Sequence, residues 1–183
     1  MFTDTRSKSI VFVAHCVLNQ NAVSDGTATH GGTVQEMVDF LNRTRVGIVQ
    51  MPCPELLCLG LDRGNPKGGT SPVVEENSRI RKALQDTSAI NMLKAIVENV
   101  VFQITEYQKY GFDIRGIVGI NRSPSCGVDT TSAHNKEIAG HGLFIDALQK
   151  ALQARGITIP VIGIKSSDTK RMVQSIRDLI ENN

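Results

Sequence analysis

Three apolar runs of strand length, each followed by a polar turn that carries a cysteine, constrain how this chain can fold. The turns are His15-Cys16, Pro52-Cys53-Pro54 and Ser123-Pro124-Ser125-Cys126-Gly127. β-Branched residues dominate the runs, as in buried strands, and the Pro, Gly and Ser residues of the turns stop a strand. Open parallel sheets bind ligands just beyond the carboxyl ends of their strands. We therefore expect the three cysteines to meet in one crevice.

Strand-like and helix-like segments alternate along the whole chain. We expect strands at 9–15, 46–51, 113–120 and 157–164, and helices from Thr33 to about Arg45, within 74–110, around 143–152 and from Ser167 or Asp168 onward. This alternation is typical of a parallel α/β sheet with helices on both faces. Right-handed crossovers and short connections favour strand order 2-1-3-4. The prediction is one α/β domain over residues 1–183, a three-layer flavodoxin- or Rossmann-like parallel sheet.

Local signals mark several element boundaries. Residues Thr33 to Glu36 match a capping box, which would begin a helix. Residues 86–88 divide the long helical region into two helices, and Gly111 and Gly156 are expected to follow the ends of helices. Residues 16–30 are polar and rich in turn formers, so we expect an irregular loop there.

The connection over residues 52–73 is too long to be an ordinary one and holds four of the six prolines, which indicates a functional or mobile segment. We expect residues 61–72 to form a mobile cover over the cysteine crevice. Residues Gly64 to Thr70 are similar to a phosphate-binding loop, but the Walker spacing is absent and no strand leads into them. A cover is therefore favoured over a nucleotide loop.

Composition narrows the classes of function. The 183 residues carry a formal net charge of +2, no Trp and two Tyr, so the clustered basic surface and stacking aromatics of nucleic-acid binding are absent. The polar first residues lack the apolar core of a signal peptide, and no run reaches the about 20 apolar residues of a membrane span. We expect a cytoplasmic protein with no membrane or nucleic-acid partner. Nothing in the sequence indicates an oligomeric state.

The four cysteines allow several interpretations. Cys58 lies in an apolar run and fits a buried core residue, whereas the other three lie in polar turns. A structural zinc site would require paired ligands such as Cys-x2-Cys, and the spacing of Cys53 and Cys58 does not match. A nucleophilic cysteine would need a histidine, and no spacing specifies one among His15, His30, His134 and His141.

Three thiolates without a fourth ligand suit an iron–sulfur cluster with one iron left open. His15 adjoins Cys16, but neighbouring residues on a strand point to opposite faces of the sheet. We therefore expect no fourth protein ligand. An open iron is a Lewis acid that can bind a substrate or a sulfur atom.

The motifs around the three cysteines resemble those of the thiouracil desulfidase family, in a shorter, related branch. The matching residues are Cys16-Val17-Leu18, Cys53-Pro54-Glu55-Leu56 with Gly60-Leu61-Asp62-Arg63, and Arg122-Ser123-Pro124-Ser125-Cys126-Gly127. Asn19-Gln20-Asn21 departs from the family pattern, as does the segment after Leu61. These departures leave the identity of the substrate open.

The resemblance implies an α/β domain that holds a [4Fe-4S] cluster on three cysteines and leaves one iron open. The implied ligands are Cys16, Cys53 and Cys126, the implied acid–base pair is Glu55 and Ser123, and the implied substrate contacts are Asn19, Arg63 and Ser125. The implied reaction removes sulfur from a thiolated pyrimidine or similar thioamide as hydrogen sulfide. Two alternatives stay open: a non-catalytic metal- or sulfur-binding module, and a nucleotide-binding α/β enzyme.

Overall fold

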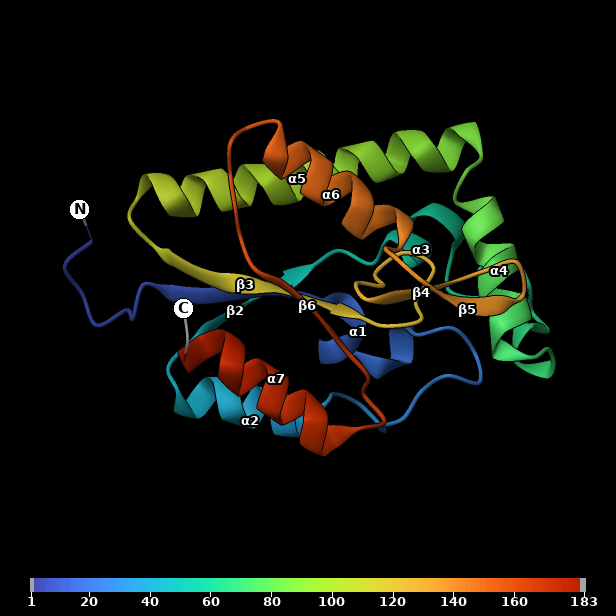
Figure 1. Ribbon diagram of the computed structural model, residues 1–183, viewed down its shortest axis with the longest axis horizontal. Helices are drawn as coiled ribbons and strands as arrows, with labels where there is room; N and C mark the ends of the chain where they lie inside the picture. The colour runs from blue at the N-terminus through green and yellow to red at the C-terminus, as the bar shows by residue number, and fades with distance from the viewer. Residues whose placement is uncertain (1, 182–183) are drawn as a thin grey trace.

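The predicted apolar runs pair side by side in a four-stranded parallel sheet (Figure 1). The computed structural model describes residues 2–181. The strands are β1 (Ser9–Ala14), β2 (Gly47–Met51), β3 (Asp113–Ile120) and β6 (Val161–Ile164). Their order is β2-β1-β3-β6, which confirms the predicted order 2-1-3-4. The three strands that precede the cysteine turns are therefore neighbours.

Helices cover both faces of this sheet, which confirms the three-layer α/β fold. In Figure 1, α5 (Thr87–Lys109) and α6 (Leu143–Gln153) lie on one face, and α2 (Gln35–Arg43) and α7 (Thr169–Glu181) lie on the other. The central strand β1 is buried almost throughout, because both of its faces pack against helices. This explains why its sequence is a continuous apolar run and does not alternate with polar residues.

Most predicted helix boundaries agree with the structure. The long helical region divides at residues 84–86 into α4 (Val73–Ala83) and α5. Gly111 and Gly156 follow α5 and α6 with φ angles of +73° and +68°, the left-handed conformation that glycine adopts at helix ends. Asp168 precedes α7, and its Oδ1 accepts the backbone N–H of Arg171 at 3.2 Å.

Several predicted boundaries are wrong for identifiable reasons. The capping box does not form, because the Thr33 hydroxyl donates to the carbonyl of Val17 at 3.1 Å and α2 begins only at Gln35, ending at Arg43 instead of Arg45. The fourth strand of the sheet covers residues 161–164 only. Pro160 precedes it and has no N–H with which to extend the ladder.

The segment 16–30 was predicted to be an irregular loop, but it begins with a helix. The helix α1 (His15–Leu18) directly continues β1, and the 3-10 helix η1 (Gln20–Ala22) follows it. Asn19 joins the two, and its side chain accepts the N–H of Asn21 at 3.1 Å. The turn formers of this segment therefore cap short helices.

The connection 52–73 also contains regular structure that its proline and glycine content concealed. Helix α3 (Pro54–Leu59) begins directly after Cys53, whose Sγ accepts the Leu56 N–H at 3.4 Å, and the 3-10 helix η2 covers Gly68–Thr70. Proline is favoured at the first position of a helix, where its missing N–H has no intrahelical partner to lose.

A β-hairpin after the third cysteine turn was not predicted. Strands β4 (Thr130–Ala133) and β5 (Lys136–Ala139) pair antiparallel and lie beside α4 (Figure 1). His134 and Asn135 connect them with φ angles of +53° and +59°, as a type I′ turn requires. The strands are too short to show an alternating pattern in the sequence.

Two glycines allow the Cys126 turn to pack closely on its neighbours. A Cβ at Gly119 of β3 would lie 2.3 Å from the backbone oxygen of Cys126, and one at Gly142 would lie 2.4 Å from the backbone of Ser125. Both contacts are with backbone atoms, which cannot move without moving the turn. The position of Cys126 thus depends on the absence of two side chains.

We expect Gly119→Ala to destabilise the protein by about 1–3 kcal/mol, because overpacking a tight contact costs that much. The matched control is Gly32→Ala, where an added Cβ meets nothing within 4 Å. Urea unfolding of both variants measures the difference. Equal stability of Gly119→Ala and the wild type would show that the turn can shift freely.

Candidate functional site

The carboxyl ends of the neighbouring strands open into one cavity of about 340 Å³. Cys16 enters it from α1, Cys53 from the turn after β2, and Cys126 from the turn after β3. Cys58 does not line it; this half-buried residue of α3 donates from its Sγ to the Ala89 carbonyl at 3.6 Å. The geometry therefore separates Cys58 from the other three cysteines.

The three cysteines of the cavity lie within electrostatic reach of one another. Burial and the neighbouring Cys53 raise the pKa of the Cys16 thiol to about 12. Burial and then the charges of Cys16 and Cys53 raise the pKa of Cys126 well above its usual value. Burial and then Glu55 raise the pKa of Cys53. Without a cation between them, these groups are held as thiols.

The donor set fits a cluster better than a single ion. Within residues 2–181, no three His, Cys, Asp or Glu side chains converge closely enough to hold one metal ion. In an iron–sulfur cluster, however, each thiolate binds a different iron, so the ligands stand farther apart than around one ion. Cys126 is buried and Cys16 and Cys53 are half-buried around one cavity. Three such cysteines are compatible with that arrangement, because bound metal removes the proton from a coordinating thiol.

Glu55 forms the polar centre of the cavity. It lies in the first turn of α3, it is 6% exposed, and four groups donate to its carboxylate. Oε1 accepts the hydroxyls of Ser125 at 2.6 Å and Ser123 at 3.3 Å, and Oε2 accepts Arg63 Nε at 3.2 Å and Ser24 at 3.4 Å. The predicted pair of Glu55 and Ser123 is therefore in contact, with Ser125 as a closer third member.

The two serines also shape the turn that presents Cys126. The Ser123 Oγ accepts the backbone N–H of Cys126 at 3.0 Å and that of Ser125 at 3.3 Å. Its own proton is then directed to Glu55. The Ser125 Oγ also lies 3.6 Å from the Cys126 Sγ, so this buried hydroxyl touches both the carboxylate and a predicted cluster ligand.

Arg63 was predicted to bind the substrate, but its donors are all engaged within the protein. Its Nε donates to Glu55, its Nη1 to the carbonyls of Gly60 and Leu61, and its Nη2 to the carbonyl of Ala22 and the Cys53 Sγ. A guanidinium has five N–H donors, so none remains for a ligand. The side chain is 2% exposed. Arg63 therefore fixes the site, and its predicted contact with substrate stays a prediction.

The backbone of Arg63 is also unusual, with a φ angle of +56°. Non-glycine residues adopt this left-handed conformation rarely, and at a cost. Here the residue follows α3 in the chain, and its side chain reaches back to Glu55. The sequence Gly60-Leu61-Asp62-Arg63 offered no signal for this arrangement.

Of the two neighbours Asn19 and Gln20, the structure places Gln20 and not Asn19 at the cavity. Asn19 does not line the cavity, and its side chain caps η1; its predicted substrate contact stays a prediction. The next residue, Gln20, does line it and is buried. Gln20 donates to the Cys16 carbonyl at 2.7 Å and accepts the Thr29 N–H at 3.0 Å. It thereby holds α1 against the loop that follows.

His15 is a cavity residue that the sequence reasoning excluded. The argument assumed a strand, but His15 and Cys16 both belong to α1 and both line the cavity. The His15 Nε2 atom is buried and has no hydrogen-bond partner among the described residues, which costs about 1–3 kcal/mol. Burial and the nearby Arg63 lower the pKa of His15, which favours the neutral imidazole.

The other three histidines do not line this cavity. His30 is near Glu36, with Nε2 and Oε2 3.6 Å apart, and His134 and His141 are exposed. Burial also raises the pKa of every cysteine in the chain. A cysteine nucleophile needs a lowered pKa, so this interpretation is disfavoured.

The expected cover over the cavity is not seen. Of residues 61–72, Arg63 alone lines the cavity, and the segment is tied to α4. The Asn65 amide donates to Glu76 at 2.9 Å, and Arg79 donates to the Arg63 carbonyl at 2.7 Å. Gly68 is buried against the Glu76 side chain. These contacts place the segment beside α4.

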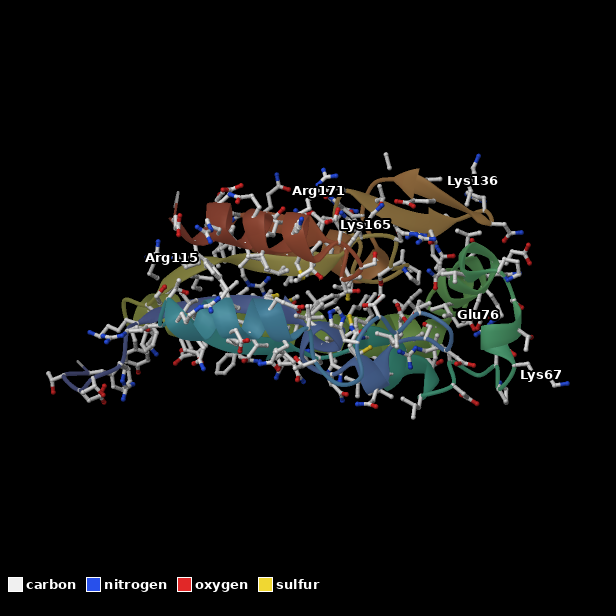
Figure 2. The ribbon with its side chains drawn as sticks, turned by 90° about the horizontal axis from the view of Figure 1, so that it is seen from below. Lys67, Glu76, Arg115, Lys136, Lys165 and Arg171 are labelled. Carbon is white, nitrogen blue, oxygen red and sulfur yellow. The ribbon has the colours of Figure 1, made fainter. Side chains whose placement is uncertain are left out.

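The residues that were compared with a phosphate loop are unsuited to an anion. Gly68 lines a second cavity together with three carboxylates, those of Asp25, Asp62 and Glu76, which would repel a phosphate. Lys67, the cation of the segment, is exposed and points away from the body of the protein (Figure 2). The structure therefore offers no support for a nucleotide site here.

Comparisons with known proteins give two distant similarities. No protein-family model matches the chain. An uncharacterized protein of Methanocaldococcus jannaschii is 27% identical over 179 residues, which cover 96% of this chain and 99% of that protein. A solved structure described as a [4Fe-4S]-dependent thiouracil desulfidase, TudS, aligns with 92% of this chain and 98% of its own, at 18% identity and a TM-score of 0.49. Among residues 2–181, no helix is long and apolar enough to cross a membrane.

We expect Arg63→Lys to destabilise the protein by about 3–5 kcal/mol, the usual cost of breaking a buried ion pair. A lysine cannot reproduce five directed donors, so Glu55 and several carbonyls lose partners. The matched control is Arg155→Lys, which affects an exposed pair with Glu98 and should change stability by less than about 1 kcal/mol. Thermal and urea unfolding measure both. Similar losses in the two variants would contradict the central role of Arg63.

Proposed function

We propose that the protein is an iron–sulfur-cluster-dependent desulfidase. Its substrate is a small thiolated pyrimidine or similar thioamide. The thiocarbonyl carbon loses its sulfur as hydrogen sulfide and gains oxygen from water. The supporting observation is the joint cavity: three cysteines from the ends of three adjacent strands line it together with a buried carboxylate that two serines and an arginine hold.

The residues present fit a [4Fe-4S] cluster on Cys16, Cys53 and Cys126. Such a cluster supplies a Lewis-acidic iron for a soft thiocarbonyl sulfur. The motif resemblance to the thiouracil desulfidase family points to the same three ligands. The cavity volume of about 340 Å³ lies within the usual range for small-molecule sites.

Glu55 is the proposed proton acceptor for the attacking water. Its carboxylate is held on both oxygens, by Ser123 and Ser125 on one side and by Arg63 on the other, so it needs no reorientation before it accepts a proton. A general base of this kind contributes typically about 10²–10⁴-fold to the rate.

The serines are the proposed route by which a proton returns to the substrate. The Ser125 hydroxyl donates to Glu55 at 2.6 Å, and the Ser123 hydroxyl lies 3.2 Å from the Ser125 hydroxyl. A proton on Glu55 can therefore pass through a hydroxyl to a ring nitrogen or to the departing sulfur. Burial of Ser125 and Glu55 limits the access of bulk water to this route.

We expect Cys16→Ala, Cys53→Ala and Cys126→Ala each to abolish the cluster and sulfide release, because each would remove one of three protein thiolates. Cys58→Ala is the matched control and should keep full iron content, since Cys58 lies outside the cavity. Iron and sulfide analysis of anaerobically prepared protein measures this, with about four irons per chain expected. Iron loss in Cys58→Ala together with normal iron in Cys53→Ala would reverse the assignment.

Colourless wild-type protein that takes up zinc but no iron under these conditions would refute the proposal. Full iron without sulfide release from 2-thiouracil, 4-thiouracil or a simple thioamide would instead favour a non-catalytic sulfur-binding module.

We expect Glu55→Gln to keep iron content and colour but to lower sulfide release from a thiouracil by about 10²–10⁴-fold. Ser123→Ala should lower it more mildly, because water can partly replace a hydroxyl. The control is Glu75→Gln, an exposed carboxylate of α4, which should have no effect. Unchanged release from Glu55→Gln would eliminate Glu55 as the base, and loss of its iron would make it a support for the cluster.

A further inference from the structure

The side chain of Asn77, on α4, lies at the cavity but has no part in the chemistry proposed above. Val73 and Asn77 both line the cavity, and residues four positions apart share one face of a helix. This face of α4 is therefore turned toward the cavity. Asn77 is only 7% exposed, so the packing around it holds its amide in place.

The hydrogen bonds of Asn77 fix which way its amide points. Its Nδ2 donates to the Arg122 carbonyl at 3.5 Å and to the Ser132 Oγ at 3.4 Å. The Ser132 hydroxyl itself donates to the same Arg122 carbonyl at 2.7 Å, so both neighbours of Nδ2 act as acceptors. An amide turned the other way would place its oxygen, which can only accept, against two acceptors. The Oδ1 atom therefore points away from Arg122 and Ser132.

The Oδ1 atom of Asn77 is unpaired but open to solvent. It accepts no hydrogen bond from residues 2–181, where the bonds of this side chain all come from Nδ2. The side-chain atoms of these residues that are sealed from solvent without a partner are His15 Nε2 and Thr130 Oγ1, and Asn77 Oδ1 does not belong to them. The oxygen therefore keeps contact with solvent, and we place this contact in the cavity that Asn77 lines.

The other two side-chain amides on the cavity wall, those of Gln20 and Asn121, are occupied within the protein. The Gln20 Oε1 accepts the Thr29 N–H at 3.0 Å, and the Asn121 Oδ1 accepts the Asp129 N–H at 2.9 Å. Asn77 therefore offers the cavity an amide oxygen that the fold leaves unused. A largely buried acceptor gains free energy when a donor reaches it, so a ligand with an N–H group suits this position.

The contacts of Asn77 place it beside the proposed catalytic groups. Asn77 donates to the carbonyl of Arg122, and the next residue, Ser123, donates to Glu55 at 3.3 Å. The amide thus adjoins the turn that carries the serines and Cys126. A substrate held at Glu55 therefore occupies the same cavity as the unused oxygen of Asn77.

From these contacts we infer that Asn77 is a specificity-determining residue whose Oδ1 accepts the N–H of the substrate's thioamide group. The inference rests on the proposed function and names the part of the substrate that is recognised. Thiolated pyrimidines and secondary thioamides carry this N–H next to the thiocarbonyl carbon, whereas an N-methylated thioamide lacks it. Asn77 thus selects substrates with a free thioamide N–H.

Pairs of ligands that differ by one N-methyl group test this contact. Calorimetry compares uracil with 3-methyluracil on anaerobically prepared wild-type protein, because these oxo compounds have no sulfur to lose. Sulfide release compares 4-thiouracil with its 3-methyl derivative. The wild type should prefer the free N–H by about 10–100-fold in affinity and in kcat/KM, because leaving a buried acceptor without its donor has a cost of that size.

Three variants show whether Asn77 causes the preference. Asn77→Ala should keep its iron and lose most of the preference, mainly through a higher KM, because the contact binds substrate and transition state alike. Ser132→Ala removes the shorter bond to the Arg122 carbonyl but leaves the oxygen of Asn77, so it should keep the preference. Asn99→Ala, at an exposed position of α5, is the surface control and should match the wild type.

The outcomes separate this inference from the proposed function. Sulfide release with the full preference retained in Asn77→Ala, or lost equally in Ser132→Ala, overturns the role of Asn77 and leaves the desulfidase intact. Equal binding of uracil and 3-methyluracil by the wild type overturns that role without any variant. Wild-type protein that holds no iron and releases no sulfide overturns both proposals. A preference that is lost in Asn77→Ala and kept in the other two variants supports the contact.

Discussion

The buried ion pair between Glu55 and Arg63 is the interaction on which the rest of the site depends. Arg63 binds the carboxylate and also the carbonyls of Ala22, Gly60 and Leu61. It therefore joins the segment after α1, the end of α3 and its own turn. Removal of either charge would leave the other buried without a partner, which is costlier than the loss of the attraction alone. One residue thus fixes Glu55 and its surroundings together.

The order of the strands could be predicted because long apolar runs carry strong signals. β1 and β3 are continuous apolar segments, and alternation with helices restricts the sheet to few topologies. From that order it follows that Cys16, Cys53 and Cys126 lie at one edge. The contact between Glu55 and Ser123 was likewise accessible, because each residue lies close to one of these cysteines in sequence.

The parts that could not be predicted depend on side-chain partners distant in sequence. Nothing around Arg63 reveals that its donors would be used by Ala22 and Glu55, so a substrate contact was inferred instead. The helical turn at His15 was missed because a four-residue helix has no periodic pattern. This helix matters for the site, because both of its first two residues, His15 and Cys16, line the cavity. Sequence patterns report regular elements well, and they report poorly on residues where one element changes into another.

The placement of Cys126 has a consequence for how the protein is made. Synthesis proceeds from the N-terminus, and β1 and β2 can pair before β3 has emerged, but the third thiol arrives only with the turn after β3. Until β3 pairs with β1, Cys16, Cys53 and Glu55 lack the residues after β3 that contact them in the folded protein. Insertion of the proposed cluster would therefore have to follow synthesis of at least two thirds of the chain. A chain that ends before the turn after β3 would lack the third of the three proposed ligands.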